Sequence, residues 1–139
     1  MLFRSEMDLQ ALLYHSIMSR IGRNTDWKIY NNLRLFELPP NKRVYVDMLF
    51  IKNGSPKIAI EIKTWGPSNE LIEKDINKLE DILKYYPSVK KGLLILLHHP
   101  KAKYNEIKTT NKINMIFLSG ENSNAMGIGT HVELWRLNL

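Results

Sequence analysis

The sequence predicts a single α/β domain over residues 1–139, with a central mixed β-sheet flanked by helices. Helix-like and strand-like apolar patterns alternate along the chain, and no internal repeat or linker divides them. Residues 93–97 are a continuous apolar run, which is typical of a strand covered on both faces. A length of 139 residues and an apolar fraction of 44% suit one domain with a substantial core.

Two long helices are predicted from apolar residues that recur at helical spacing. Leu9, Leu13 and Ile17 predict the first helix, from about residue 5 to residue 21, and Gly22 ends it. The second helix opens at residues 67–69 and ends at Pro87. Its apolar stripe consists of Leu71, Ile72, Ile76, Leu79, Ile82, Leu83 and Tyr86. For Asp75 and Lys78 on this helix, the solvated face is the default expectation, and a position flanking the functional site is the alternative.

Strands are predicted where apolar or alternating segments are bounded by turn-forming residues. These segments are residues 27–38, 44–51, 57–64, 93–97, 113–118 and 132–137. A short lysine-bearing helix is expected over residues 102–109, and residues 119–130, rich in Gly, Asn and Ser, read as a loop. The predicted order is therefore α-β-β-β-α-β-(α)-β-β.

Three charged residues interrupt two neighbouring apolar strands. Asp47 lies in the strand 44–51, and Glu61 and Lys63 lie in the strand 57–64. Because side chains alternate along a strand, Glu61 and Lys63 share one face, while the isoleucines between and before them share the other. Charges are costly to bury in such surroundings, so we expect them to act together. Two carboxylates can hold a divalent cation, and the ammonium can help to direct water at a phosphodiester.

The position of the turn decides whether the two carboxylates can meet. Pairing Asp47 with Glu61 in an antiparallel hairpin predicts a three-residue connection, Asn53-Gly54-Ser55. A tight two-residue Asn-Gly turn would shift the pairing by one residue and place the carboxylates on opposite faces. We therefore expect Gly54 in a three-residue turn or a bulge.

With these residues, the sequence resembles the PD-(D/E)XK nuclease superfamily over about residues 5–98. In that resemblance Glu6 is the glutamate of the first helix, Asp47 is the first carboxylate, and Glu61-Ile62-Lys63 is the second element. Val46 stands where the namesake proline of the family would be. The resemblance implies a restriction-endonuclease-like fold with an αβββαβ core.

The resemblance also implies roles for these residues. Asp47, Glu61 and the main-chain carbonyl of Ile62 would hold Mg²⁺, for which Mn²⁺ could substitute, and no organic cofactor is expected. Lys63 would orient the attacking water, or act as a base if burial lowers its pKa. Glu6 would reach a second metal or tie the first helix to the site.

The charge of the chain predicts a nucleic-acid partner, and we expect DNA. The net charge is +6, with seven lysines against one acid between Lys84 and Lys112 and a second basic stretch between Arg20 and Arg43. A lysine-rich solvated surface is the alternative interpretation. One small domain reaches one strand, so a double-strand cut would need a homodimer.

Other features limit the alternatives. The chain has no cysteine, which excludes disulfides and thiolate metal sites, and no apolar run of membrane-spanning length. We therefore expect a soluble, cytoplasmic protein without a secretory leader. His98 and His99 are more typical of a strand end than of a metal site. A metal-dependent deoxyribonuclease is the favoured function, and a non-cleaving nucleic-acid-binding module or a subunit of a larger complex is the alternative.

Overall fold

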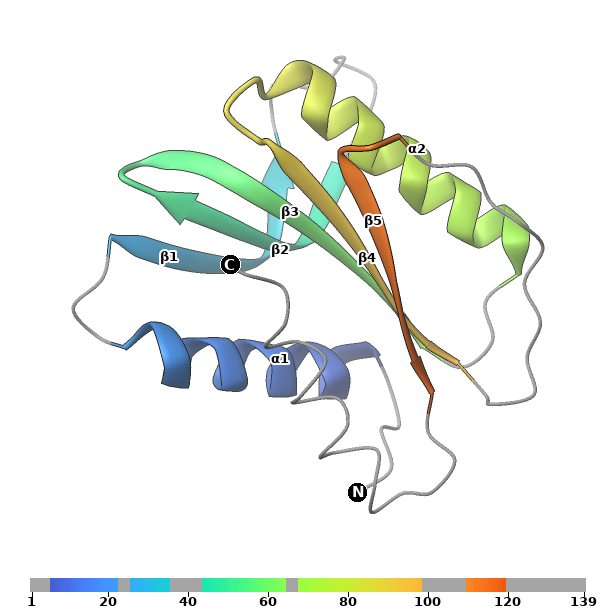
Figure 1. The fold of residues 1–139 in the computed structure, drawn as a ribbon, viewed down its shortest axis with the longest axis horizontal. Helices are drawn as coiled ribbons and strands as arrows, with labels where there is room; N and C mark the ends of the chain where they lie inside the picture. The colour runs from blue at the N-terminus through green and yellow to red at the C-terminus, as the bar shows by residue number, and fades with distance from the viewer. Residues whose placement is uncertain (1–5, 23–25, 36–43, 65–67, 99–109, 120–139) are drawn as a thin grey trace.

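The computed structural model describes residues 6–22, 26–35, 44–64, 68–98 and 110–119, which form a mixed α/β fold (Figure 1). Its elements are α1 (Glu6–Ile21), β1 (Trp27–Leu35), β2 (Val44–Lys52), β3 (Ser55–Thr64), α2 (Asn69–Tyr85), β4 (Lys91–His98) and β5 (Ile113–Ser119). The predicted class, a mixed sheet flanked by helices, is confirmed. The expected helix at 102–109, nearly all of the loop at 119–130 and the strand at 132–137 lie outside the described residues.

The five strands form one sheet in the order β1-β2-β3-β4-β5. β1, β2 and β3 are antiparallel neighbours, whereas β3 with β4 and β4 with β5 are parallel pairs. A parallel pair needs a crossover connection, and α2 supplies the one between β3 and β4. The central strand β3 therefore joins the antiparallel half of the sheet, which includes the β2–β3 hairpin, to the parallel half.

The two helices cover opposite faces of the sheet (Figure 1). On the α1 face, Leu9, Leu13 and Ile17 pack with residues that include Ile60 and Ile62 of β3. On the α2 face, the buried cluster is made of Leu35, Val44, Val46, Leu49, Ala59, Ile72, Ile76, Leu79, Ile82, Val89, Leu94, Leu96 and Ile113. The predicted alternation along β3 is confirmed, because its isoleucines face α1 while Ala59 faces α2.

The prediction that Leu71 belongs to the buried apolar stripe of α2 was wrong. Leu71 is 46% exposed, whereas Ile72 beside it is fully buried. Leu71 lies in the first turn, where Ser68 caps the helix by accepting a hydrogen bond from the Leu71 N–H. The buried stripe of α2 therefore begins at Ile72.

The connection between β2 and β3 differs from the predicted three-residue turn. Lys52 pairs with Ser55, so only Asn53 and Gly54 connect the strands. Both residues have positive φ angles, 51° and 77°, as a type I′ turn requires at its two central positions. The backbone twist of a type I′ turn matches the right-handed twist of the flanking strands, and this match favours the two-residue connection.

A β-bulge restores the register that the short turn would otherwise change. The pairing shifts between Phe50 and Ile51, where β3 contributes one extra residue, Lys57. Beyond the bulge the ladder runs in the register that brings Asp47 opposite Glu61. The two carboxylates therefore meet as expected, although by a two-residue turn and a bulge.

Candidate functional site

Asp47 and Glu61 lie where the β2–β3 ladder ends, directly after the last pair, Met48 with Ile60. The Ile62 N–H donates a 2.8 Å hydrogen bond to Oδ2 of Asp47. The Asp47 N–H donates a longer one, 3.4 Å, to Oε1 of Glu61. Each carboxylate thus accepts a main-chain N–H from the other strand, which holds the two side chains close together at the end of the ladder.

Gln10 of α1 fixes the same point from the other face of the sheet. Its Nε2 donates to the main-chain oxygen of Asp47 at 2.6 Å and to Oδ1 of Asn31 at 3.3 Å. Gln10 is buried among the apolar residues of α1. The sequence analysis missed it, although its spacing of three residues from Leu13 and seven from Ile17 places it on the apolar stripe.

Glu61 is a buried carboxyl group with a strongly perturbed pKa. Only 1% of the residue is exposed. Burial, and then the negative charge of Asp47, raise its pKa from 4.5 to about 8. Lys78 opposes this rise, because its Nζ lies 2.8 Å from Oε2 of Glu61. A further positive charge beside Glu61 would therefore stabilise the ionised form of its carboxyl group at neutral pH.

Lys63 projects from the end of β3 between the two helices. Its Nζ lies 3.5 Å from Oδ2 of Asp75 on α2 and 3.7 Å from Oε1 of Glu6 on α1. Burial lowers the pKa of Lys63, but the Asp75 and Glu6 carboxylates outweigh it, so that the pKa lies above its usual value. Lys63 is therefore an ammonium group here, and the expectation that it could act as a base is not supported.

The default expectation of a solvated face for Asp75 and Lys78 was wrong, and both residues lie beside the predicted site residues, as the alternative had it. Asp75 is 6% exposed, and Lys78 is half-buried against Glu61. Burial raises the pKa of Asp75, against the opposing charges of Lys63 and Lys78. Its Oδ2 has no hydrogen-bond partner among the described residues, so the contact with Lys63 is an ion pair without a well-formed hydrogen bond. The sequence signal was position, because Asp75 follows Ile72 by three residues on the buried stripe.

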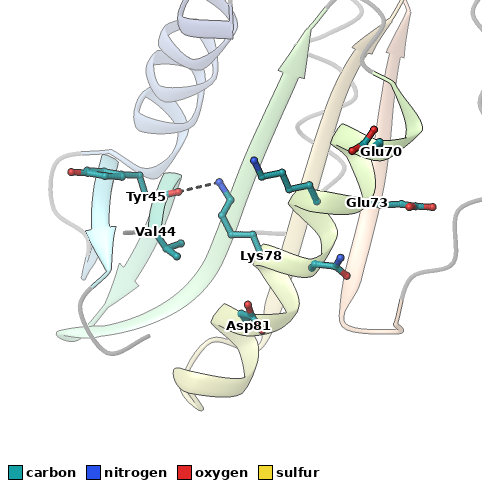
Figure 2. A pocket seen from close by; sticks show the side chains of 8 residues that line it. Val44, Tyr45, Glu70, Glu73, Lys78 and Asp81 are labelled. Atoms are coloured by element: carbon teal, nitrogen blue, oxygen red, sulfur yellow. Dashed lines mark hydrogen bonds between the residues drawn. The ribbon is translucent and has the colours of Figure 1, made fainter. Parts of the chain in front are cut away.

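Beside this site, a groove of about 750 Å³ runs between the start of β2 and α2. Tyr45, Lys74, Lys78 and Asp81 are among the residues that line it. Figure 2 shows Lys78 extending from α2 to the main-chain oxygen of Tyr45, which accepts its hydrogen bond at 3.1 Å. Lys78 therefore lines the groove and also forms an ion pair with the buried carboxyl group of Glu61.

The charges of the site do not balance. Among the described residues, the carboxylates of Glu6, Asp47, Glu61 and Asp75 lie near two ammonium groups, those of Lys63 and Lys78. If all are ionised, two negative charges remain, which equals the charge of one divalent cation. Burial is the main cause of the raised pKa values of Glu61 and Asp75, and the negative charge of Asp47 adds to both.

Few side chains among the described residues are placed to bind a metal ion together. No group of three or more His, Asp or Glu side chains among them is arranged to hold an ion. Asp47, Glu61 and the Ile62 carbonyl remain the donor set that the sequence predicted. The side chains of His98 and His99 lie outside the described part of the chain.

The two basic stretches are only partly described. Their exposed members in the structure are Arg20, Lys28, Arg34, Lys84, Lys90, Lys91 and Lys112. Their other members lie outside the described residues: Arg23, Lys42, Arg43, Lys101, Lys103 and Lys108. The described part therefore offers positive charge at several places on the surface without defining a continuous face.

Comparisons with models of protein families, with curated proteins and with solved structures found no match to this chain. Neither of the described helices is long and apolar enough to cross a membrane.

Proposed function

We propose that this chain is a metal-dependent nuclease that hydrolyses phosphodiester bonds in DNA, on a restriction-endonuclease-like version of its α/β fold. One observation carries the proposal: Asp47 and Glu61 are held together at the end of the β2–β3 ladder, with Lys63 on the same strand as Glu61. The resemblance to the PD-(D/E)XK superfamily assigns these same residues to its site, with Glu6 on the first helix.

The donor set suits a magnesium ion. Mg²⁺ accepts one or two protein carboxylates, keeps several waters and takes its remaining ligands from phosphate oxygens. Asp47, Glu61 and the Ile62 carbonyl would hold it, and a divalent ion would stabilise the ionised forms of both carboxyl groups, which lie close together. When bound, the cation supplies Lewis-acid chemistry that neutralises phosphate charge and makes water more acidic.

Lys63 contributes a fixed positive charge. Because Asp75 and Glu6 keep it as an ammonium group, it can orient a water molecule and stabilise negative charge on the phosphoryl group. Glu6 and Asp75 are then positioning residues, which hold Lys63 from α1 and α2. This contact supports the second of the two roles expected for Glu6, which is to tie the first helix to the site.

A non-cleaving nucleic-acid-binding module, alone or as a subunit of a complex, is the second candidate. The observation that favours it is the ion pair between Lys78 and Glu61, which makes the charged cluster resemble a structural network. The two candidates predict different effects when one of these charged residues is replaced. A structural network loses stability when a partner is removed, whereas a cation site loses cleavage and metal binding.

Three substitutions distinguish these functions: Asp47→Ala, Glu61→Ala and Lys63→Ala. We expect all three to abolish cleavage, the two carboxylate variants to weaken Mn²⁺ binding, and Lys63→Ala to leave it within about threefold, since an ammonium group cannot be a ligand. The melting temperatures of the carboxylate variants should hold or rise, because one of two neighbouring negative charges is removed.

The assay uses the purified chain with plasmid, linear, branched and single-stranded DNA and with RNA, in Mg²⁺, Mn²⁺ or EDTA. Glu73→Ala, which removes an exposed carboxylate of α2, and Lys52→Ala, at the turn end of the hairpin, are the matched controls. Full cleavage by Lys63→Ala would refute the proposal, as would unfolding of the carboxylate variants without any change in metal affinity. Cleavage of RNA alone would correct the substrate class.

A further inference from the structure

We infer that Lys78 is an internal counter-ion of the cation site: its ammonium group takes the place beside Glu61 that a divalent cation requires, and it must leave when the cation binds. This inference rests on the proposed function, because it concerns the same site. It goes beyond that function because it assigns a residue that would control how tightly the site binds metal.

The surroundings of the Lys78 ammonium resemble those of a bound cation. Its Nζ lies 2.8 Å from Oε2 of Glu61, 3.1 Å from the main-chain oxygen of Tyr45 and 4.0 Å from Oδ1 of Asp75. These oxygens come from β3, β2 and α2, so the fold itself gathers them. Carboxylate and carbonyl oxygens are the ligands that hard divalent cations prefer.

The burial of Glu61 explains why an internal cation is present. An ionised carboxyl group that is 1% exposed is costly unless a positive charge lies beside it. The Lys78 ammonium supplies that charge and is the charged partner nearest to Oε2 among the described residues. A divalent cation at the same oxygen would repel the ammonium, so the two cannot share the position.

The two lysines of the site differ in what holds them. Lys63 pairs with Asp75 and Glu6, which are not among the ligands proposed for this cation, and it can stay when the cation binds. Lys78 pairs most closely with Glu61, which is an expected ligand. Cation binding should therefore displace Lys78 and leave Lys63 in place.

The groove provides the space for this displacement. Lys78 lines the groove of about 750 Å³ between β2 and α2, which Asp81 also lines (Figure 2). A lysine has a long flexible stem, so its ammonium can move from the carboxyl group into such a groove by rotation of the side chain alone. The helix α2 does not have to move.

The test compares Mn²⁺ affinity by calorimetry, on the metal-free chain without nucleic acid. Lys78→Met should bind Mn²⁺ about tenfold more tightly than the wild type or better, which corresponds to ~1.4 kcal/mol. Lys78→Arg keeps the competing charge, and Lys74→Met removes an equal charge from the same groove one turn away, so both should stay within about threefold of the wild type. Unchanged or weaker binding by Lys78→Met overturns the inference, as does equal tightening by Lys74→Met.

A second measurement uses the wild-type chain and does not depend on the folding of a variant. The Lys78 side-chain NMR signal, assigned from the spectrum of Lys78→Arg, should shift when Mg²⁺ saturates the site, and that of Lys74 should not. An unchanged Lys78 signal at saturation refutes displacement. Tighter Mn²⁺ binding by Lys78→Met without any cleavage would refute the nuclease and leave this inference standing, whereas cleavage with unchanged affinity would do the reverse. No binding of either ion would refute both.

Discussion

Replacing Glu61 with glutamine measures what the buried carboxyl group costs the fold. Burial, together with Asp47, raises the pKa of Glu61 from 4.5 to about 8. The folded protein then binds this proton more tightly than the unfolded chain does, so stability falls as pH rises from the lower value to the higher one. Glu61→Gln keeps the shape of the side chain but cannot ionise, and it should not show this loss.

The size of the effect follows from the two pKa values. At ~1.36 kcal/mol per pKa unit, the interval from 4.5 to about 8 sets an upper limit of roughly 5 kcal/mol above pH 8. At pH 7 roughly 3 kcal/mol should already be lost. The unfolding free energies of Glu61→Gln and the wild type should agree near pH 4. At pH 7 the variant should melt about 10 °C higher, for a chain of this size.

The assay is urea unfolding of both proteins at pH 4, 7 and 9 in EDTA. Glu73→Gln, which changes an exposed carboxylate of α2, is the control and should follow the wild type at every pH. Mg²⁺ at about one hundred times its Kd should return ~2.7 kcal/mol to the wild type and to Glu73→Gln, but not to Glu61→Gln, which lacks a proposed ligand. A difference between Glu61→Gln and the wild type that is equal at pH 4 and pH 9 would refute the reasoning.

Two further predictions concern DNA binding and the hairpin. Lys112→Gln, which removes an exposed charge of the basic stretch between Lys84 and Lys112, should lower affinity for all DNA sequences and reduce the slope of log K against log salt by about one; affinity that does not change with salt would contradict a phosphate-binding role. Gly54→Ala should cost about 1 kcal/mol in urea unfolding, since its φ of 77° is unfavourable for a residue with a Cβ atom. Asn53→Gly, at the neighbouring position of positive φ, should change stability much less, and an equal loss in both variants would argue against the turn geometry.

The fold could be predicted from the sequence because apolar periodicity reports burial. The alternation along β3 correctly separated Glu61 and Lys63 from the isoleucines, and the continuous run at 93–97 correctly indicated an internal strand. The turn could not be predicted in the same way. Pairing Asp47 with Glu61 fixes the register of the two strands. The same register can result from a three-residue turn or from a two-residue turn followed by a bulge, and the sequence does not distinguish these.

The charged partners on α2 show a different limit of sequence reasoning. Asp75 and Lys78 were assigned to solvent because charged residues are seldom buried. Asp75 lies on the buried stripe of α2, so its position carried a signal that its residue type outweighed. The partner of Lys78 is Glu61 on another element, and no local pattern predicts that contact.

The charge imbalance bears on the choice between a structural network and a cation site. A network retained for stability alone gains nothing from surplus buried carboxylates, since replacing them with apolar residues of similar volume is often neutral or stabilising. Among the described residues, the buried carboxyl groups of Glu61 and Asp75 have raised pKa values, and the more exposed Glu6 and Asp47 lie near the same two lysines, Lys63 and Lys78. The ionised form of a buried carboxyl group costs stability unless enough positive charge lies beside it. A site that must attract a divalent cation requires this surplus, and an ammonium group that the cation can displace limits its cost until the cation arrives.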